Sequence, residues 1–238
     1  MYCGVVIVLA YAVRGSTGFG AAAAMPLLGL VVPVKILVPV WTLLGIASSV
    51  AIVARDWRHI VVDALLRTLP AGLLGVAVGL YFFKMLEART LARGLGLLVA
   101  AYGCYSLWAA VRPPARLERP PRFVAPIAGI LGGAVGTTFG TMASVFYAIY
   151  FDAIGMAKER FRATMSAMLL TLSILRGIGY FAVGEVGLEA LLSFAAALPL
   201  MLLGIFIGDR FHARITDLAF RRLVSAILIV SGVALFMK

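Results

Sequence analysis

The chain has 238 residues, of which 63% are hydrophobic and 13% are charged, and its mean hydropathy is +1.07. A soluble domain of this size could not bury so much apolar surface, because soluble chains carry roughly a quarter charged residues. The net charge of +11 lies in short clusters between apolar runs, which argues against a nucleic-acid-binding protein and makes the lipid bilayer the expected partner. With only two cysteines, Cys3 and Cys104, neither a disulfide scaffold nor a cysteine-rich metal cluster is expected.

Six apolar runs are long enough to cross a bilayer as helices, because about 20 residues at about 1.5 Å each cover the hydrocarbon layer. Membrane strands would alternate in polarity at every second residue, and these runs do not. The sequence therefore predicts an all-α polytopic membrane protein. The predicted spans are 36–54, 60–83, 91–111, 163–184, 190–208 and 221–237.

Two further apolar segments are interrupted by small residues. Segment 1–32 is broken by residues 14–20, and segment 123–151 is broken by residues 132–140. The pieces on either side of a break have about 12 residues, which as helix is about half a membrane crossing. Each segment could form a kinked span or a re-entrant hairpin, and the glycines could also serve only close helix packing.

The chain divides into two similar halves, which we interpret as an internal duplication. A proline-rich and arginine-rich linker at 112–122 separates a first repeat, 1–111, from a second repeat, 123–238. The residues that recur at a spacing of 129 are Leu69-Pro70, Leu73-Leu74-Gly75, Gly79, Arg93 and Gly103 in the first half, and Leu198-Pro199, Leu202-Leu203-Gly204, Gly208, Arg222 and Gly232 in the second.

The distribution of positive charge favours hairpins over kinked spans. If both broken segments span, the lysines and arginines outside the membrane divide 11 to 8, which gives no clear orientation. If both are hairpins, they divide 14 to 5, with the linker cytoplasmic and both termini outside. Each repeat then has a glycine-broken re-entrant hairpin and three transmembrane helices, and the two repeats are inverted.

The breaks are the candidate substrate site. Paired interrupted segments at matching places in inverted repeats are typical of transporter binding sites, and helix N-termini, expected near Ala21 and Thr141, favour anions. Arg14 and Arg176 lie in apolar surroundings, where a guanidinium needs a cavity, a partner or an anion. The predicted site residues are Arg14, Ser16, Thr17, Gly18, Phe19, Gly20, Thr137, Thr138, Phe139, Gly140 and Arg176.

Structural explanations for the two arginines stay open at this point, because each could reach the membrane surface or bond a backbone carbonyl, and Asp152 could pair with one of them. No catalytic or nucleotide-binding motif occurs in the sequence, so neither an enzyme nor a cofactor is expected.

The break before Met25-Pro26-Leu27-Leu28, its echo at Phe139-Gly140 and the repeated Leu-Pro helix resemble the sulfite exporter TauE/SafE family over nearly the whole chain. The resemblance implies transport of sulfite, sulfoacetate or other organosulfonates across the bacterial plasma (inner) membrane. The chain departs from the usual pattern in its thinned glycine runs, Gly18-Phe19-Gly20 and Thr138-Phe139-Gly140-Thr141, and the second half lacks the proline.

We therefore expect a multi-pass secondary transporter that carries a small anion by alternating access between the two repeats. An anion channel and a non-transporting scaffold or subunit remain the alternatives, and a homo-oligomer is compatible with the sequence.

The topology gives the first prediction. In a background with Cys3 and Cys104 replaced by alanine, cysteines introduced into the 112–122 linker and the 210–217 loop should react with an impermeant maleimide from the cytoplasmic side. A cysteine at position 238 should react from outside, because both hairpins return to their side of entry. Opposite accessibility of the linker and the 210–217 loop would restore two spanning segments and parallel repeats.

Overall fold

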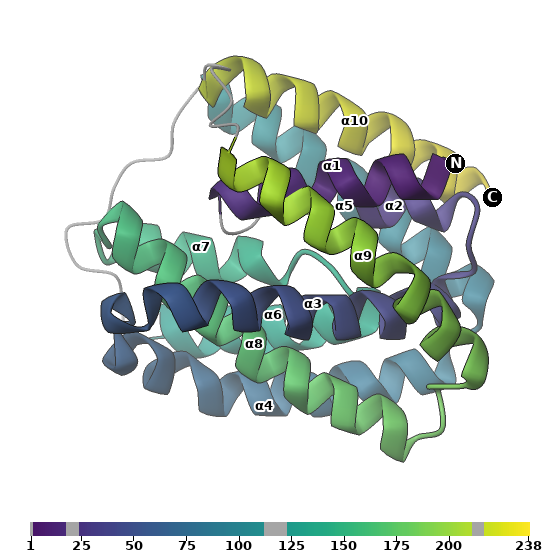
Figure 1. Cartoon of the computed structure of the whole chain (residues 1–238), viewed down its shortest axis with the longest axis horizontal. Helices are drawn as coiled ribbons and strands as arrows, with labels where there is room; N and C mark the ends of the chain where they lie inside the picture. The colour runs from purple at the N-terminus through teal and green to yellow at the C-terminus, as the bar shows by residue number, and fades with distance from the viewer. Residues whose placement is uncertain (1, 18–23, 112–122, 211–216) are drawn as a thin grey trace.

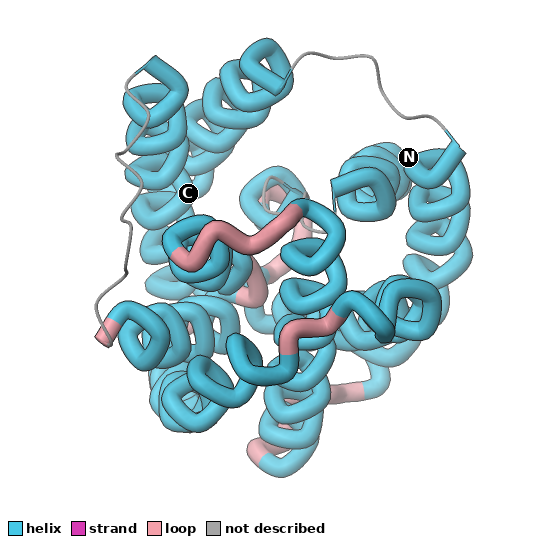
Figure 2. Tube along the Cα trace, turned by 90° about the vertical axis from the view of Figure 1, so that its left-hand side faces the viewer, coloured by secondary structure: helices cyan, strands magenta, loops and turns pink. Residues whose placement is uncertain are grey.

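The computed structural model describes residues 2–17, 24–111, 123–210 and 217–238 (Figure 1). Within these ranges all regular structure is helical, as predicted. The end-on view of Figure 2 looks along most of the helices, so they run roughly parallel or antiparallel as a bundle. The α-helices are α1 Tyr2–Thr17, α2 Ala24–Gly29, α3 Val34–Asp56, α4 Val62–Met85, α5 Ala88–Val111, α6 Val124–Phe139, α7 Ala143–Ala153, α8 Lys158–Ala182, α9 Leu188–Arg210 and α10 Asp217–Met237, and the short 3-10 helix η2 Trp57–His59 follows α3.

Four stretches of helix within the described residues are both long and apolar enough to cross a membrane: Val34–His59, Val62–Met85, Glu159–Ala182 and Leu188–Gly208. They correspond to four of the predicted spans, and the protein is a multi-pass membrane protein. The runs predicted at 91–111 and 221–237 lie in α5 and α10, which are 24 and 21 residues long.

Glycines set the closest helix contacts, and they do so in the same way in both halves. Helix α4 packs on α6, and α9 packs on α1. A methyl group at Gly79 would lie 2.6 Å from the carbonyl oxygen of Ala134, and one at Gly204 would lie 2.6 Å from that of Val8. These backbones touch at distances that only glycine permits. The glycines of the repeated Leu-Leu-Gly motifs are therefore packing positions, each placed against the first helix of the other half, whereas the leucines before them are exposed.

The central pair of helices, α3 and α8, packs antiparallel and is joined by ion pairs near both ends. Lys35 Nζ lies 3.2 Å from Glu185 Oε1, and Arg162 Nε lies 3.3 Å from Asp56 Oδ2. Helices α5 and α10 form a second antiparallel pair, which packs through glycines such as Gly96 and Gly232, and α5 also contacts α3. The middles of α3 and α8 therefore lie deep inside the bundle.

Both broken segments turn back on themselves. Tyr2 at the start of α1 donates a hydrogen bond to the carbonyl oxygen of Leu27 in α2 (3.2 Å), so the first segment returns to the end where it begins. In the second segment, Tyr147 of α7 donates to the carbonyl oxygen of Gly129 in α6 (3.4 Å), which makes α6 and α7 an antiparallel hairpin. The N and C termini lie at one end of the bundle, on the right in Figure 1. Lys238 Nζ accordingly donates to the carbonyl oxygen of Leu30 (3.0 Å).

The break predicted at 132–140 is wrong in its extent. Helix α6 continues to Phe139, and only residues 140–142 separate it from α7, which begins at Ala143. The glycines inside α6 serve packing: a methyl group at Gly132 would meet the ring of Tyr147, and one at Gly136 would lie 2.6 Å from Ala143 Cβ. Close packing offsets the roughly 1 kcal/mol by which glycine weakens a helix. In the first segment α1 likewise extends to Thr17, and residues 18–23 lie outside the described residues.

The glycine contacts give a prediction about stability. Gly79→Ala and Gly204→Ala should each destabilise the protein by about 1 to 3 kcal/mol, because the added methyl group overpacks a helix contact that cannot widen without moving a backbone. Gly187→Ala is the matched control, because nothing lies within 4 Å of a methyl group there. Thermal unfolding in detergent would measure the three variants. Equal melting temperatures for all of them and the wild type would contradict the assigned role of the glycines.

Candidate functional site

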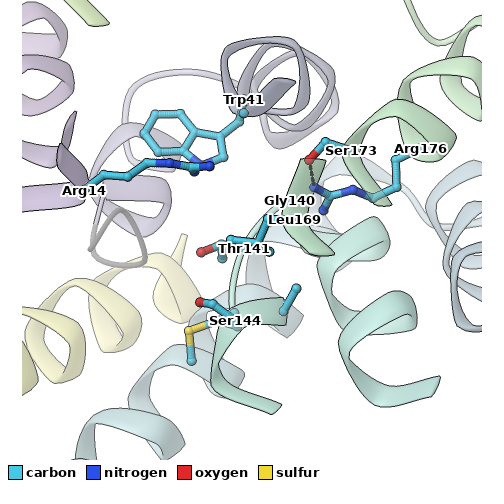
Figure 3. Close-up of a pocket in the computed structure, with 11 residues that line it drawn as sticks. Arg14, Trp41, Gly140, Thr141, Ser144, Leu169, Ser173 and Arg176 are labelled. Atoms are coloured by element: carbon cyan, nitrogen blue, oxygen red, sulfur yellow. Dashed lines mark hydrogen bonds between the residues drawn. The ribbon is translucent and has the colours of Figure 1, made fainter. Parts of the chain in front are cut away.

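A cavity of about 50 Å³ lies where the tip of the α6–α7 hairpin faces the middles of α3 and α8 and the last turn of α1 (Figure 3). One buried water needs roughly 10 to 15 Å³ of such space, so the cavity has room for several waters or a small ion. The residues that line it are Arg14, Trp41, Gly45, Gly140, Thr141, Met142, Ala143, Ser144, Leu169, Ser173 and Arg176.

Arg14 reaches the cavity from the last turn of α1 and is only 7% exposed. Its Nη2 donates a hydrogen bond to Ser49 Oγ of α3 (2.7 Å). Its guanidinium carbon lies 6.0 Å from the ring centroid of Tyr11, where the aromatic face adds a weak attraction for the cation. Its Nε is buried and has no hydrogen-bond partner among the described residues.

Arg176 comes from α8 on the other side of the cavity and is 6% exposed. Its Nη1 donates to the carbonyl oxygen of Gly136, and its Nη2 donates to Ser173 Oγ (2.7 Å). Its Nε, like that of Arg14, is buried and unpartnered within the described part of the chain. A carbonyl was one of the structural partners considered from the sequence, and here it accounts for only one of the five donors of the guanidinium.

Neither arginine forms an ion pair with a carboxylate in the part of the chain that the structure describes. Asp152, the acid considered from the sequence, is exposed and pairs with neither of them. A buried charge without a counter-charge costs several kcal/mol, and arginine cannot escape this cost by losing its proton. An anion in the cavity would supply the missing counter-charge to both side chains.

The hairpin tip brings backbone to the same place. Gly140 has φ +71°, and Met142 has φ +69°, the left-handed conformation that residues other than glycine rarely adopt. Helix α7 begins at Ala143 without a side-chain cap, so several of its first N–H groups lack partners within the helix. This N-terminus lines the cavity and presents the positive end of the helix dipole.

The structure brings together three of the residues predicted for the site, namely Arg14, Gly140 and Arg176. The side chains of Ser16 and Thr17 and the whole of Gly18, Phe19 and Gly20 lie outside the described residues, as does the helix start expected near Ala21.

The remaining predicted residues lie on α6 and are not among those that line the cavity. Thr138 Oγ1 donates to the carbonyl oxygen of Gly79 (3.3 Å), and Thr137 Oγ1 is buried without a partner among the described residues. The ring of Phe139 packs against Gly94, where a methyl group would lie 3.1 Å from it. Thr138 and Phe139 thus contribute to the packing around the hairpin.

Sequence reasoning missed several residues of the cavity, among them Ser173, and it missed Ser49, which contacts Arg14 but does not line the cavity. Ser173 lies one helical turn before Arg176, a spacing that could have identified it. Ser49 is 35 residues from Arg14, and only the packing of α1 on α3 brings the two together. Trp41 and Leu169 carry no sequence signal that separates them from other apolar core residues.

Comparison with known protein families gives a match to the family described as sulfite exporter TauE/SafE over residues 3–235. The match confirms the resemblance seen in the sequence, and it includes both halves and every residue that lines the cavity. No curated protein and no solved structure matches the chain.

The conformation of the hairpin tip can be tested with two glycines. Gly140→Ala should reduce transport and stability, because its methyl group would lie 2.6 Å from Met25 Cε and because φ is +71°. Gly155→Ala is the matched control: φ there is +67°, but nothing lies within 4 Å, so it measures the backbone cost alone, about 1 kcal/mol. Flux and melting temperature should fall further in Gly140→Ala. Equal effects of the two substitutions would show that the space at the tip is unimportant.

Proposed function

Because the chain belongs to the sulfite exporter TauE/SafE family of membrane transporters, we propose that it is a secondary transporter that moves a small anion, sulfite or an organosulfonate such as sulfoacetate, across the bacterial plasma membrane. One observation carries the proposal: two buried guanidiniums line a single cavity, and neither has a carboxylate partner among the described residues.

The chemistry of the cavity suits an oxyanion. A guanidinium presents planar pairs of N–H donors that match two oxygens of a sulfite or sulfonate group. The uncapped N-terminus of α7 adds backbone N–H donors and a favourable dipole. The hydroxyls of Thr141 and Ser144 belong to the same lining and can donate as well. An acceptor-only ligand would therefore satisfy several donors at once.

The size of the cavity favours the smaller of the candidate substrates. A volume of about 50 Å³ suits sulfite, with four heavy atoms, better than sulfoacetate, which has twice as many. The indole ring of Trp41 and the side chain of Leu169 form apolar walls beside the two guanidiniums. For an organosulfonate, the cavity would have to widen around the remainder of the molecule.

Two inverted repeats, 1–111 and 123–238, are part of the proposal. The packing supports them. Gly75 lies against the carbonyl of Ile130, and Gly204, 129 residues later, lies against the carbonyl of Val8. Val8 and Ile130 are themselves 122 residues apart, so corresponding glycines meet corresponding carbonyls. Each hairpin thus packs on the long helix of the opposite half. Alternating access would follow from movement of these two units around the cavity between them.

The burial of the arginines favours a carrier over an anion channel. A conducting pore would expose such side chains to water, but both are at least nine-tenths buried. Saturable flux without single-channel currents in a planar bilayer is expected for the carrier. A non-transporting scaffold, in contrast, would neither bind an anion nor support flux in vesicles.

The function is tested by Arg14→Ala and Arg176→Ala. A charge-assisted hydrogen bond contributes roughly 1.5 to 3 kcal/mol, so each variant should bind sulfite about ten- to a hundredfold more weakly. Lysine at either position should restore only part of the affinity, because an ammonium lacks the planar pair of donors.

Affinity by calorimetry and melting temperature should be measured on the same preparations. Arg67→Ala is the control, since Arg67 forms an exposed ion pair with Asp63 (2.9 Å) and lies outside the cavity. Unchanged affinity in both cavity variants, with only a lower melting temperature, would reject the anion site.

A further inference from the structure

Each buried arginine is held by one serine from the central pair of helices. Arg14 donates to Ser49 of α3, and Arg176 donates to Ser173 of α8. In both cases the bond runs from Nη2 to the serine Oγ and is 2.7 Å long. Ser49 and Ser173 are themselves buried, with at most 2% of their surface exposed. The same bond therefore occurs twice around one cavity.

The two serines occupy corresponding positions in the two halves. Helices α3 and α8 both begin after a residue in extended conformation, Pro33 with ψ 133° and Ala157 with ψ 147°, and these residues are 124 positions apart. The same spacing relates Ser49 to Ser173. Both serines therefore stand 16 residues after the residue that precedes their helix, about four and a half turns along it.

The arginines come from positions that do not correspond, yet their guanidiniums meet corresponding serines. Val8 of α1 and Ile130 of α6 are corresponding packing positions 122 residues apart. By the same spacing, the residue of α6 that corresponds to Arg14 is Gly136. Because Gly136 has no side chain, Ala143 and Arg176 can both approach it: a methyl group at residue 136 would lie 2.6 Å from Ala143 Cβ and 3.2 Å from Arg176 Nη1. The two halves thus each provide one guanidinium, but from helices that do not correspond: α1 in the first half and α8 in the second.

The direction of the hydrogen bonds leaves each serine with a free donor. Arginine has only donors, so the serine oxygen accepts and its hydroxyl proton remains available. No bond donated by either hydroxyl is found among the described residues. Each serine therefore acts on the site through its arginine, whose Nε has no partner among the described residues.

We propose that Ser49 and Ser173 are equivalent positioning residues of the anion site, each of which fixes the plane of one guanidinium so that its unpartnered donors face the bound anion. This inference rests on the proposed function. Without the serine bond, the guanidinium of Arg14 can rotate about its long side chain, and that of Arg176 is held only by its bond to the carbonyl oxygen of Gly136. Part of the binding free energy is then lost in fixing each guanidinium.

The test compares Ser49→Ala and Ser173→Ala with Ser49→Thr and Ser173→Thr, using sulfite as the probe. Each alanine variant should bind sulfite about three- to tenfold more weakly, by similar factors, and threonine should restore binding because it keeps the hydroxyl. Ser48→Ala is the matched control: Ser48 is fully buried next to Ser49, but its hydroxyl donates to the carbonyl oxygen of Gly45 (3.2 Å). It should leave the affinity unchanged.

A double-mutant cycle separates positioning from mere stabilisation. Because Ser173 acts through Arg176, Ser173→Ala should weaken sulfite binding in the wild type and have no further effect in an Arg176→Ala background. Ser49→Ala should behave likewise with Arg14→Ala.

The possible results are distinct. Binding that depends on both arginines but is unaffected by either Ser→Ala variant would overturn the positioning role and leave the proposed function standing. A loss confined to one serine would overturn their equivalence. Wild-type protein that neither binds nor moves sulfite would overturn the proposed function, and this inference with it.

Discussion

The site depends on the cost of burying two guanidiniums in the apolar centre of the bundle. Each guanidinium has five donors, and the described residues accept from Arg14 once and from Arg176 twice. Buried donors need partners, and water or an anion in the cavity can supply partners for donors that the described residues leave unpaired. Arginine cannot become neutral as a buried lysine can, and the charge therefore persists whether or not the cavity is occupied. In the proposed function, an entering anion would meet a positive field that is already in place.

Glycine performs two different tasks in this fold, and both serve the cavity. Along α4, α6 and α9 it lets helix backbones touch, which packs each hairpin on a long helix of the other half. At Gly140 it provides a left-handed residue and leaves room for Met25 Cε. As a result the cavity draws on both halves: Arg14, Trp41 and Gly45 come from the first, and the hairpin tip, Leu169, Ser173 and Arg176 from the second.

The sequence was informative where a feature stands out against an apolar background. Long apolar runs predicted the helices, and the charges of Arg14 and Arg176, which are rare in such runs, indicated two residues that line the cavity. Glycine patterns were ambiguous, since the same residue breaks a helix or packs it. Gly129 and Gly133, four residues apart, pack against α4, and Gly132 and Gly136, also four apart, pack against α7, so the glycines of α6 serve packing on two faces of one helix. Contacts such as that between Arg14 and Ser49 could not be predicted, because only the packing of separate helices decides them.

The energies along α3 and α8 suit the alternating access proposed for this chain. The ion pairs Lys35–Glu185 and Asp56–Arg162 join the two helices near opposite ends, with side chains that remain 22% to 25% exposed. Partly hydrated pairs contribute at most about 1 kcal/mol, so either end can separate at little cost. Their similar exposure also means that these pairs alone favour neither end. The arginines between them are different, because exposing them to water at one end would relieve the cost of their burial while the other end stays closed. In the proposed mechanism, an anion bound between the arginines would reduce that cost, so its presence would decide how readily the site passes through the closed arrangement in which both ends are shut.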